Sequence, residues 1–352
     1  MLKVAQQWSR KSEISYLLPQ LGYSSLKKDL VAGEAIIIDS RFENESSSLL
    51  RVVLLYCARL WKILTLPPQK QYDVIVASNH FLIDVIPALY LQSKLRSGKL
   101  VAYYHGLPVK ESSLWWRLAR TLNDMLSVAL LRKYFDTIFA INQTVKDFLI
   151  SQKVDAKKIV ITNNGIDPIV LREGYQKPIF EACFVGRLVT SKGVADLVEI
   201  WKDVSAKIPG AKLAIVGDGP EMGWIAKRIE KEGLEEHIAL FGYLEDERFD
   251  VMHSSKLFLL PSYAESWPIV IIEAMGCGLP VVAYDLPELR TVWEDEITYV
   301  PKGDRDSFKQ SVLSLLENPR LRSKFAENGL KLSKRYLWRF IAECEADAIE
   351  RV

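Results

Sequence analysis

Two glutamates, Glu265 and Glu273, lie on either side of the predicted start of a helix, and they are the strongest chemical signal in the sequence. The helix is expected to begin near Pro268, after a buried strand and a polar loop. The first turn of a helix leaves backbone N–H groups without partners, here around Ile269 and Val270, and such groups bind anions. Carboxylates accept hydrogen bonds from sugar hydroxyls. The segment therefore predicts a site that holds both a phosphate and a sugar.

Two cations, Arg187 and Lys192, are expected on the loop that follows the predicted strand 180–185. Gly186 lets the chain turn sharply as it leaves the sheet. A guanidinium and an ammonium together suit a pyrophosphate, because the first makes paired contacts and the second acts as a point charge. Spacing alone favours two solvated loop cations. The glutamates on a neighbouring loop shift the interpretation to a nucleotide-sugar site.

Histidines follow two predicted strands in the first half of the sequence. His105 comes directly after the strand 100–104, and His80 follows the strand 73–77. A loop histidine without other context is more often a surface or packing residue. We expect His105 to be the functional histidine, and His80 is a weaker candidate on the acceptor side.

The turn Gly217–Pro220 only superficially matches the dinucleotide fingerprint G-x-G-x-x-G. Its third glycine is misplaced, a proline follows at once, and no acidic residue stands at the end of the next strand. A plain turn from strand to helix explains these residues. We therefore exclude NAD binding.

Short β-rich runs alternate with helical patterns along the whole chain, which is typical of parallel sheets in an α/β fold. The expected strands are 13–18, 35–38, 73–77, 100–104, 137–140, 158–162, 180–185, 212–216, 238–241, 257–260, 280–283 and 298–300. Prominent helices are expected at 46–64, 82–95 and 114–131, and Ser266 is placed to cap the helix that follows it.

The length of 352 residues fits two domains. The polar stretch 174–178 divides the two series of elements and is interpreted as the linker. We expect an N-terminal acceptor-side domain at 1–175, a donor-binding domain at 179–330, and a last helix at 331–352. Both domains are expected to be doubly wound and Rossmann-like, facing each other across a cleft.

Composition excludes several classes of protein. With 49% hydrophobic and 26% charged residues the chain is globular, and its apolar runs are too short to span a membrane. Residues 1–10 lack the apolar core of a secretory signal, and the four cysteines lie too far apart in sequence for a metal knuckle. The sequence contains neither a basic block nor a zinc module, so we do not expect nucleic acid as a partner.

The motifs described above follow one another in a fixed order, together with two further segments, Asn163–Asp167 and Gly278–Val282. In this order, and with Glu265 and Glu273 separated by seven residues, they resemble the retaining glycosyltransferases of family 4, which have the GT-B fold. The resemblance is specific over residues 158–301 and looser over 73–150. It also implies that the last helix, 331–352, crosses back to the N-terminal domain.

The resemblance implies how a nucleotide-diphosphate sugar donor, built on UDP or GDP, would be bound. Arg187 and Lys192 match the residues that hold the diphosphate. Glu273 matches the residue that binds the ribose, and Glu265 matches the one that binds hydroxyls of the transferred sugar. The cations would stabilise the negative charge that develops on the leaving diphosphate.

Other positions match the surroundings of the reacting sugar. Main chain around Tyr243 and Leu244 would contact the base, and His105 would lie beside the anomeric centre. Asn164 is a weaker candidate on the acceptor side, together with His80. The resemblance implies that the anomeric configuration is retained and that no metal or other cofactor is needed.

The sequence departs from the family pattern at two places. Pro268 stands where glycine is common, although proline suits the start of a helix. Family members also begin with a strand and a glycine-rich loop, whereas residues 2–9 already read as the helix that follows this loop. Either the chain as given starts late, or the N-terminal domain lacks its first strand and part of the active site.

The first half of the chain is predicted to meet something anionic. Residues 1–178 hold 24 Lys and Arg against 15 Asp and Glu, a net charge of +9, whereas the remainder has 22 against 29, or −7. Residues 48–66 and 113–134 mix apolar, aromatic and basic side chains, as helices on membrane surfaces do. Ordinary helices that cover a sheet look similar. We expect a cytoplasmic protein attached peripherally to the inner face of an anionic membrane.

We therefore predict a retaining, metal-independent hexosyltransferase that acts on a glycan or lipid-linked acceptor. An epimerase or phosphorylase with the same fold is one alternative. The other is a donor-binding pseudoenzyme or regulatory partner, since the glycine-rich loop is missing.

Overall fold

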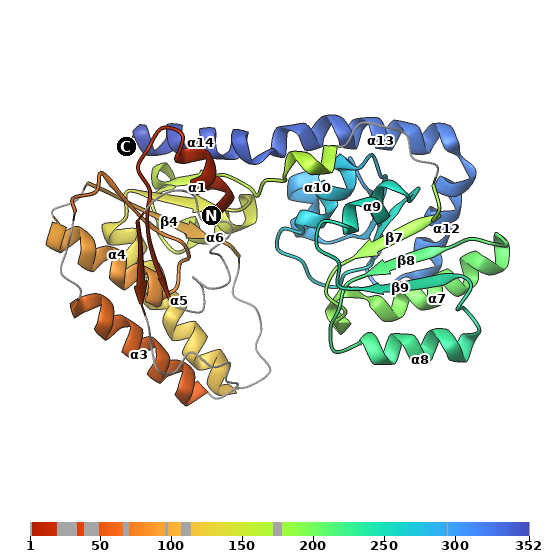
Figure 1. The fold of residues 1–352 in the computed structure, drawn as a ribbon, viewed down its shortest axis with the longest axis horizontal. Coiled ribbons are helices and arrows are strands. Elements are labelled where there is room, and N and C mark those ends of the chain that lie inside the picture. The colour runs from red at the N-terminus through yellow and green to blue at the C-terminus, as the bar shows by residue number, and fades with distance from the viewer. Residues whose placement is uncertain are drawn as a thin grey trace. The chain divides into compact units, whose positions relative to one another are not determined.

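The computed structural model describes residues 2–19, 34–38, 49–65, 70–95, 98–106, 114–171, 178–293 and 295–351. The chain divides into two compact units, which are described separately: unit 1 comprises Met1–Asn163 and Trp338–Val352, and unit 2 comprises Asn164–Leu337. In each unit, helices flank a parallel sheet (Figure 1). The predicted linker 174–178 lies almost entirely outside the described residues.

Unit 1 opens with a helix and alternates strands and helices thereafter. Its elements are α1 (Leu2–Trp8), β1 (Ser15–Pro19), β2 (Glu34–Ile38), α3 (Leu49–Thr65), β3 (Val74–Ala77), α4 (Leu82–Leu95), β4 (Lys99–Tyr104), α5 (Leu114–Tyr134), β5 (Thr137–Ala140), α6 (Gln143–Ser151), the 3-10 turn η1 (Ala156–Lys158), β6 (Ile159–Ile161) and α14 (Trp338–Glu350).

The strands of unit 1 form two separate parallel sheets. Strands β3, β4, β5 and β6 lie side by side in chain order, and β1 pairs with β2 alone. The predicted helix at 2–9 and the predicted strand at 13–18 correspond to α1 and β1. In the described part of unit 1, β3 therefore forms an edge of the four-stranded sheet.

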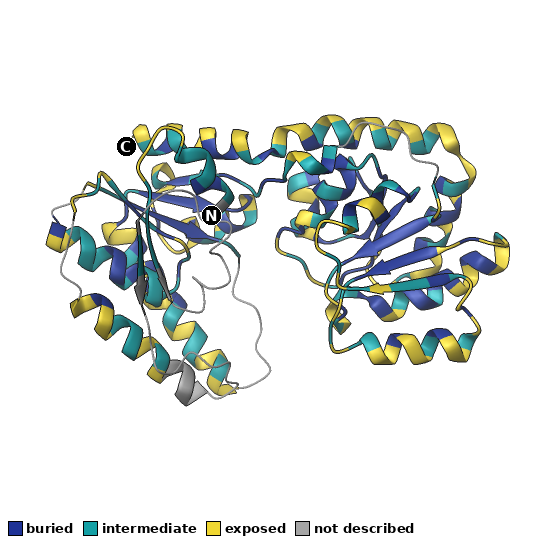
Figure 2. Ribbon diagram, in the orientation of Figure 1, coloured by how far each residue is buried: buried dark blue, intermediate teal, exposed yellow. Residues whose placement is uncertain are grey.

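Both faces of the four-stranded sheet of unit 1 are covered, which explains why its central strands are almost continuously apolar. Val101, Tyr103 and Phe139 point from β4 and β5 toward Ala348 of α14, and Trp8 of α1 packs on the same cluster. Helix α4, which connects β3 to β4 in the chain, packs against both of these strands. The strands are buried in Figure 2, while the helices keep exposed outer faces.

Unit 2 is a doubly wound domain with a six-stranded parallel sheet. Its elements are η2 (Pro168–Leu171), β7 (Ala182–Val185), η3 (Thr190–Lys192), α7 (Val194–Lys207), β8 (Leu213–Val216), α8 (Met222–Glu232), β9 (Ile238–Gly242), α9 (Arg248–His253), β10 (Phe258–Leu260), α10 (Ile269–Gly276), β11 (Val281–Tyr284), α11 (Pro287–Trp293), β12 (Thr298–Val300), α12 (Arg305–Glu317), α13 (Pro319–Ser333) and η4 (Lys334–Tyr336).

The six strands of unit 2 have the spatial order β12-β11-β10-β7-β8-β9, and all neighbours are parallel. The two ends of the unit lie side by side, because the N–H of Ile166 donates to the carbonyl of Tyr336 over 2.7 Å. Each strand predicted from the sequence is present in the two units. The α/β prediction is therefore confirmed for both.

Candidate active site

The sheet of unit 2 reverses its direction of growth between β7 and β10. These two strands are neighbours, although β8 and β9 come between them in the chain. The loops that leave the carboxyl ends of β7 and β10 run to opposite sides, and open parallel sheets bind ligands at such a reversal. The predicted cation loop follows β7 and the predicted carboxylate loop follows β10. The fold therefore brings these two loops to the same place.

The loops of β7 and β10 are joined by an ion pair. Nζ of Lys192, at the end of η3, lies 2.6 Å from Oε1 of Glu265. The Glu265 side chain is only 7% exposed and that of Lys192 24% exposed. A partly buried pair of this kind is screened less by salt than a surface pair. Lys192, predicted to bind phosphate, and Glu265, predicted to bind sugar, are thus direct partners.

Two glycines allow the loops to approach each other. Gly193 has a φ of +66°, and a Cβ atom there would lie 1.9 Å from the carbonyl oxygen of Pro261. Gly217 has a φ of +139°, and its Cβ would lie 1.9 Å from the carbonyl oxygen of Gly186. Only glycine fits these positions. The glycines of the turn after β8 therefore have a packing role, as expected for a plain turn.

Backbone hydrogen bonds complete the contact between the loops. The N–H of Tyr263 donates to the carbonyl of Ser191 over 2.8 Å, and the N–H of Leu188 donates to that of Asp218 over 2.9 Å. Arg187 directly precedes Leu188 and is exposed at the carboxyl edge of the sheet. Its guanidinium is therefore accessible to an anion from solvent.

A carboxylate that the sequence analysis missed, Asp196 of α7, holds the β10 loop to its neighbours. Its Oδ2 accepts hydrogen bonds of 2.7 Å from the hydroxyls of both Tyr263 and Tyr284. The bond to Asp196 raises the pKa of Tyr263, and burial followed by the same bond raises that of Tyr284. Both tyrosines therefore stay protonated at neutral pH and keep donating to Asp196.

Glu273, in the second turn of α10, is paired with a residue that the sequence analysis also missed. Nη2 of Arg248 lies 2.9 Å from its Oε1, and Arg248 is the first residue of α9. The Arg248 guanidinium also stacks over the ring of Phe249, with its Cζ atom 4.1 Å from the ring centroid. Both predicted carboxylates are therefore already neutralised by cations in the ligand-free protein.

Helix α10 starts at Ile269, close to the predicted position, but its cap differs from the prediction. Pro268 is the N-cap residue, with φ −73° and ψ 99° and no side-chain hydrogen bond, so the expected cap by Ser266 is wrong. Proline occupies this place because its fixed φ is compatible with extended backbone. Ile269 is exposed and Val270 half-buried, so this helix end faces solvent.

The end of β9 carries the residues predicted to meet the base. Gly242 ends the strand with a φ of +69°, and its carbonyl accepts a 2.7 Å bond from the N–H of Gly217. The chain continues into Tyr243, which is 74% exposed, and the half-buried Leu244. A large exposed aromatic side chain beside the turn after β8 is suited to stacking on a planar ring.

In unit 1, His105 follows β4 and is held in a defined orientation. Its Nε2 lies 3.0 Å from the carbonyl oxygen of Ser78, and its ring stacks on Tyr103 with centroids 5.5 Å apart. Since a carbonyl only accepts, Nε2 carries the proton and Nδ1 is left as an acceptor. Burial, and to a smaller extent His80, lower the pKa of His105. The ring is therefore neutral at physiological pH.

His80 is buried and faces the interior of unit 1. It stacks on Tyr104 with centroids 3.9 Å apart, and its Nε2 lies 3.6 Å from Oδ1 of Asp124 in α5. His80 is therefore enclosed by side chains of unit 1. Asn164, the other weak candidate, is half-buried at the first position of unit 2.

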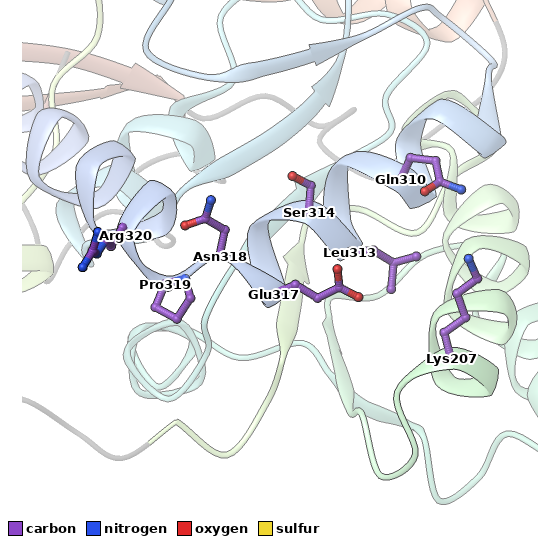
Figure 3. Close-up of a pocket in the computed structure, with 8 residues that line it drawn as sticks. All are labelled: Lys207, Gln310, Leu313, Ser314, Glu317, Asn318, Pro319 and Arg320. Atoms are coloured by element: carbon purple, nitrogen blue, oxygen red, sulfur yellow. The ribbon is translucent and has the colours of Figure 1, made fainter.

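A cavity of about 760 Å³ in unit 2 lies away from these residues. It is formed by the end of α7, α12 and the start of α13, between Lys207 and Arg320 (Figure 3). Lys207 ends α7 just before β8 begins, so the cavity is at the amino edge of the sheet. Ligands of parallel sheets bind at the carboxyl edge. We therefore place the candidate site at the β7 and β10 loops.

Comparison with known families and proteins agrees with the motifs of the sequence. Residues 173–332 match the family described as glycosyl transferases group 1, and residues 19–169 match glycosyltransferase family 4. A phosphatidyl-myo-inositol mannosyltransferase of Mycobacterium leprae is 33% identical over 174 residues, 48% of this chain and 46% of that protein. An alpha-D-kanosaminyltransferase of Streptomyces kanamyceticus is 33% identical over 46% of this chain and 43% of its own length. The chain thus matches these curated relatives over about half their length.

Solved structures share the fold at low sequence identity. Anabaena HepE, in complex with UDP and glucose, superposes with a TM-score of 0.75 at 17% identity, covering 100% of this chain and 95% of the other. A sucrose-phosphate synthase from Thermosynechococcus elongatus gives a TM-score of 0.68 at 18% identity over 96% and 98% of the two chains. With its ordered motifs, its parallel α/β units and these matches, the chain belongs to the group 1 glycosyltransferases of family 4 and has the GT-B fold.

Proposed function

We propose that this protein transfers a sugar from a nucleotide-diphosphate donor, a UDP- or GDP-sugar, to a hydroxyl of a glycan or lipid-linked acceptor. The observation that carries the proposal is the Lys192–Glu265 pair at the reversal of the sheet. A cation for the leaving phosphate and a carboxylate for sugar hydroxyls meet there, within one hydrogen-bond length. Family membership supports the same reaction class.

In the proposed complex the diphosphate lies at the mouth of the β7 loop. Arg187 makes paired contacts with its oxygens, and Lys192 neutralises charge from the other side. The first turn of α10, at Ile269 and Val270, contributes backbone N–H donors. These groups act where negative charge develops as the diphosphate leaves, so the proposed reaction needs no bound metal ion.

The two carboxylates orient the rest of the donor. Glu265 accepts hydrogen bonds from the transferred sugar, and Glu273 accepts them from the ribose hydroxyls. Both residues must exchange or share their present partners, Lys192 and Arg248, when the donor binds. The base stacks near Tyr243 and is read by the main chain of Leu244. Donor binding therefore involves a local rearrangement of ion pairs.

The proposed reaction retains the anomeric configuration. The bond between the anomeric carbon and the diphosphate oxygen breaks, the acceptor oxygen bonds to the same face of that carbon, and the acceptor proton leaves on the nucleoside diphosphate. His105, neutral and with Nδ1 free as an acceptor, assists beside the anomeric centre. The two curated relatives described above are both named as transferases, which does not favour the pseudoenzyme alternative.

We further propose that unit 1 rests on an anionic membrane surface. Helices α3 and α5 both pack on α4 and expose apolar side chains, among them Trp61 at 72%, Trp115 at 71% and Met125 at 66%. Basic residues such as Lys62 and Arg117 are exposed on the same helices. In the described ranges, no helix is long and apolar enough to cross a bilayer. A lipid-linked acceptor would be reached from such a surface.

Donor turnover tests the proposed reaction. The protein is incubated with UDP-glucose, UDP-GlcNAc, GDP-mannose and their parent nucleotides, first in a thermal-shift panel and then in an assay for released nucleoside diphosphate. A ligand at 100 times its dissociation constant stabilises the folded state by about 2.7 kcal/mol, which shifts the melting temperature by several degrees. Binding of one of these nucleotides, together with slow release of the nucleoside diphosphate from its sugar conjugate, supports the proposal. A cooperative melt that no nucleotide shifts contradicts it.

Flotation with vesicles tests the membrane contact separately. Vesicles with anionic lipid should carry the protein upward at low salt and release it at high salt. Replacing Trp61 and Trp115 together by serine should abolish flotation without changing the melting temperature. Absence of binding to anionic vesicles at low salt contradicts the contact and leaves the transfer reaction untouched.

A further inference from the structure

A carboxyl group that has no role in the proposed transfer reaction or in the proposed membrane contact lies in the core of unit 1. Glu345 of α14 is 1% exposed, and its Oε2 accepts a 2.5 Å hydrogen bond from the hydroxyl of Tyr103. An apolar residue at this position would pack on the sheet without any desolvation penalty. The carboxyl group therefore points to a role that packing alone does not require.

Tyr103 connects this carboxyl group to the candidate catalytic histidine. The Tyr103 ring is stacked on the His105 ring with an interplanar angle of 13°. It also makes an edge contact with the ring of Phe139, with the two ring centroids 5.1 Å apart. The His105 ring is fixed from the other direction by the carbonyl of Ser78. Orientation of the imidazole thus depends on one backbone acceptor and one tyrosine ring.

The helix that carries Glu345 is itself anchored at both ends. Nε1 of Trp8 donates to the carbonyl of Ala342 over 2.9 Å, and Nζ of Lys99 donates to the carbonyl of Ile349 over 2.8 Å. A lysine at the last carbonyls of a helix also complements the helix dipole. The carboxyl group is therefore presented to Tyr103 from a rigid support rather than from a mobile tail.

We propose that Glu345 is a positioning residue, which sets the plane and the tautomer of the His105 imidazole by holding the hydroxyl of Tyr103. The proposal rests on the role given to His105 in the proposed transfer reaction. Loss of the hydrogen bond lets the Tyr103 ring turn about its side-chain bonds, and the stacked imidazole follows. The bond between His105 and the Ser78 carbonyl then weakens, and the Nδ1-protonated tautomer becomes populated.

Three variants test this chain of contacts. Tyr103→Phe removes the hydroxyl and keeps the ring that packs in the core. Glu345→Leu keeps roughly the size of the side chain and removes the oxygen that accepts the Tyr103 hydrogen bond. Glu343→Leu is the matched control, because Glu343 is exposed on the same helix. If Glu345→Leu fails to fold, Tyr103→Phe alone decides.

The first readout is the ¹⁵N spectrum of the histidine rings in the ligand-free protein, which has four histidines. Assignment comes from comparison with a His105→Gln spectrum. Tyr103→Phe and Glu345→Leu should both move the His105 ring nitrogens toward a mixture of tautomers and change its pKa, whereas Glu343→Leu should leave them in place. Unchanged His105 nitrogens in the folded Tyr103→Phe protein overturn the proposal.

The second readout is donor turnover. Both variants should lower kcat about tenfold, the effect of losing one well-oriented hydrogen bond, with KM for the donor unchanged. An equal kcat in wild type and variants contradicts the positioning role. Absence of turnover in the wild type contradicts the proposed function instead, and the ring spectra still decide whether Glu345 orients His105.

Discussion

The ammonium of Lys192 and the carboxylate of Glu265 lie 2.6 Å apart and connect the two loops at which the sheet of unit 2 reverses. Neither residue comes from a strand, and 73 positions separate them in the chain. Their contact depends on β7 and β10 being neighbours. In the proposed complex, Lys192 and Glu265 would each exchange or share this partner with an oxygen of the donor.

Replacing Lys192 by methionine should weaken binding of UDP or GDP by about 10- to 100-fold, since a charge-assisted hydrogen bond to phosphate is lost. It should also lower the free energy of unfolding by about 1 kcal/mol, because the largely buried Glu265 loses its partner. Titration calorimetry and chemical denaturation measure both. Lys207→Met, at the opposite edge of the same sheet, is the control and should change neither.

Replacing Arg187 by alanine should leave the melting temperature unchanged and reduce affinity for both the nucleoside diphosphate and inorganic pyrophosphate about tenfold or more. The side chain is exposed, so its removal creates no cavity and no buried unpaired group. Calorimetric titrations with UDP, GDP and pyrophosphate report the change. Arg320→Ala removes another exposed arginine of unit 2 as a comparison. Wild-type affinity in Arg187→Ala would falsify the diphosphate assignment.

Replacing Glu273 by glutamine should weaken binding of the nucleoside part of the donor without weakening binding of its diphosphate part. Affinity for the nucleoside diphosphate should fall about tenfold through weaker hydrogen bonds to the ribose, whereas affinity for pyrophosphate should not change. The variant also removes the shorter of the two ion pairs that Arg248 makes among the described residues and leaves only the 3.9 Å contact with Asp246, so a modest loss of stability is expected. The same titrations used for Arg187 decide the matter. An equal loss for pyrophosphate would place Glu273 at the phosphates rather than at the ribose.

Gly217→Ala should destabilise unit 2 by about 3 kcal/mol or more, since both the backbone conformation and the Gly186 carbonyl oppose a Cβ atom there. Gly210→Ala is a stringent control: its φ of +83° is also positive, but no atom lies within 4 Å of the added Cβ. Urea denaturation followed by circular dichroism measures the difference. Similar losses in the two variants would mean that backbone strain alone matters at Gly217.

Stability should depend on pH through Glu345. Burial raises the pKa of its carboxyl group from 4.5 to about 7, and the hydrogen bonds from Tyr103 and Thr162 act in the opposite direction. The folded state therefore binds a proton that the unfolded state releases between these values. The contribution of Glu345 to the free energy of unfolding is therefore greatest below pH 4.5. It falls by about 3 kcal/mol in total as the pH rises to 7.

The comparison of wild type with Glu345→Gln isolates this contribution. Denaturation at pH 5 and pH 7.5 should show that the variant gains stability relative to wild type as pH rises, since glutamine cannot ionise. Glu343→Gln should follow the wild-type curve at both pH values. Parallel curves for wild type and Glu345→Gln would indicate that the carboxyl group titrates normally.

The strands were predictable because parallel strands are buried on both faces and read as short apolar runs, as Phe258–Leu260 and Val281–Tyr284 do. The loop residues of the site followed from these strands, since function lies after their carboxyl ends. Helix caps were less predictable: Ser266 and Pro268 are both compatible with the start of α10, and the backbone geometry selects Pro268.

Partners distant in sequence could not be predicted. Arg248 pairs with Glu273 across 25 positions, and neither the spacing nor the composition of α9 singles it out. Glu345 looks like one of several acidic residues on an amphipathic helix, and only its place opposite Tyr103 distinguishes it. Each of these contacts depends on the order of elements in space, which local sequence patterns do not contain.

The return of α14 to unit 1 has a consequence for biosynthesis. The cluster around Val101 and Tyr103 is covered by a helix that is translated only after all of unit 2. Unit 2 is contiguous in the chain and can fold as soon as it leaves the ribosome. The apolar face of the four-stranded sheet of unit 1, in contrast, stays uncovered by α14 until residues 338–351 emerge. Nascent chains stalled within unit 2 should therefore be chaperone substrates, and release of the last helix should end that dependence.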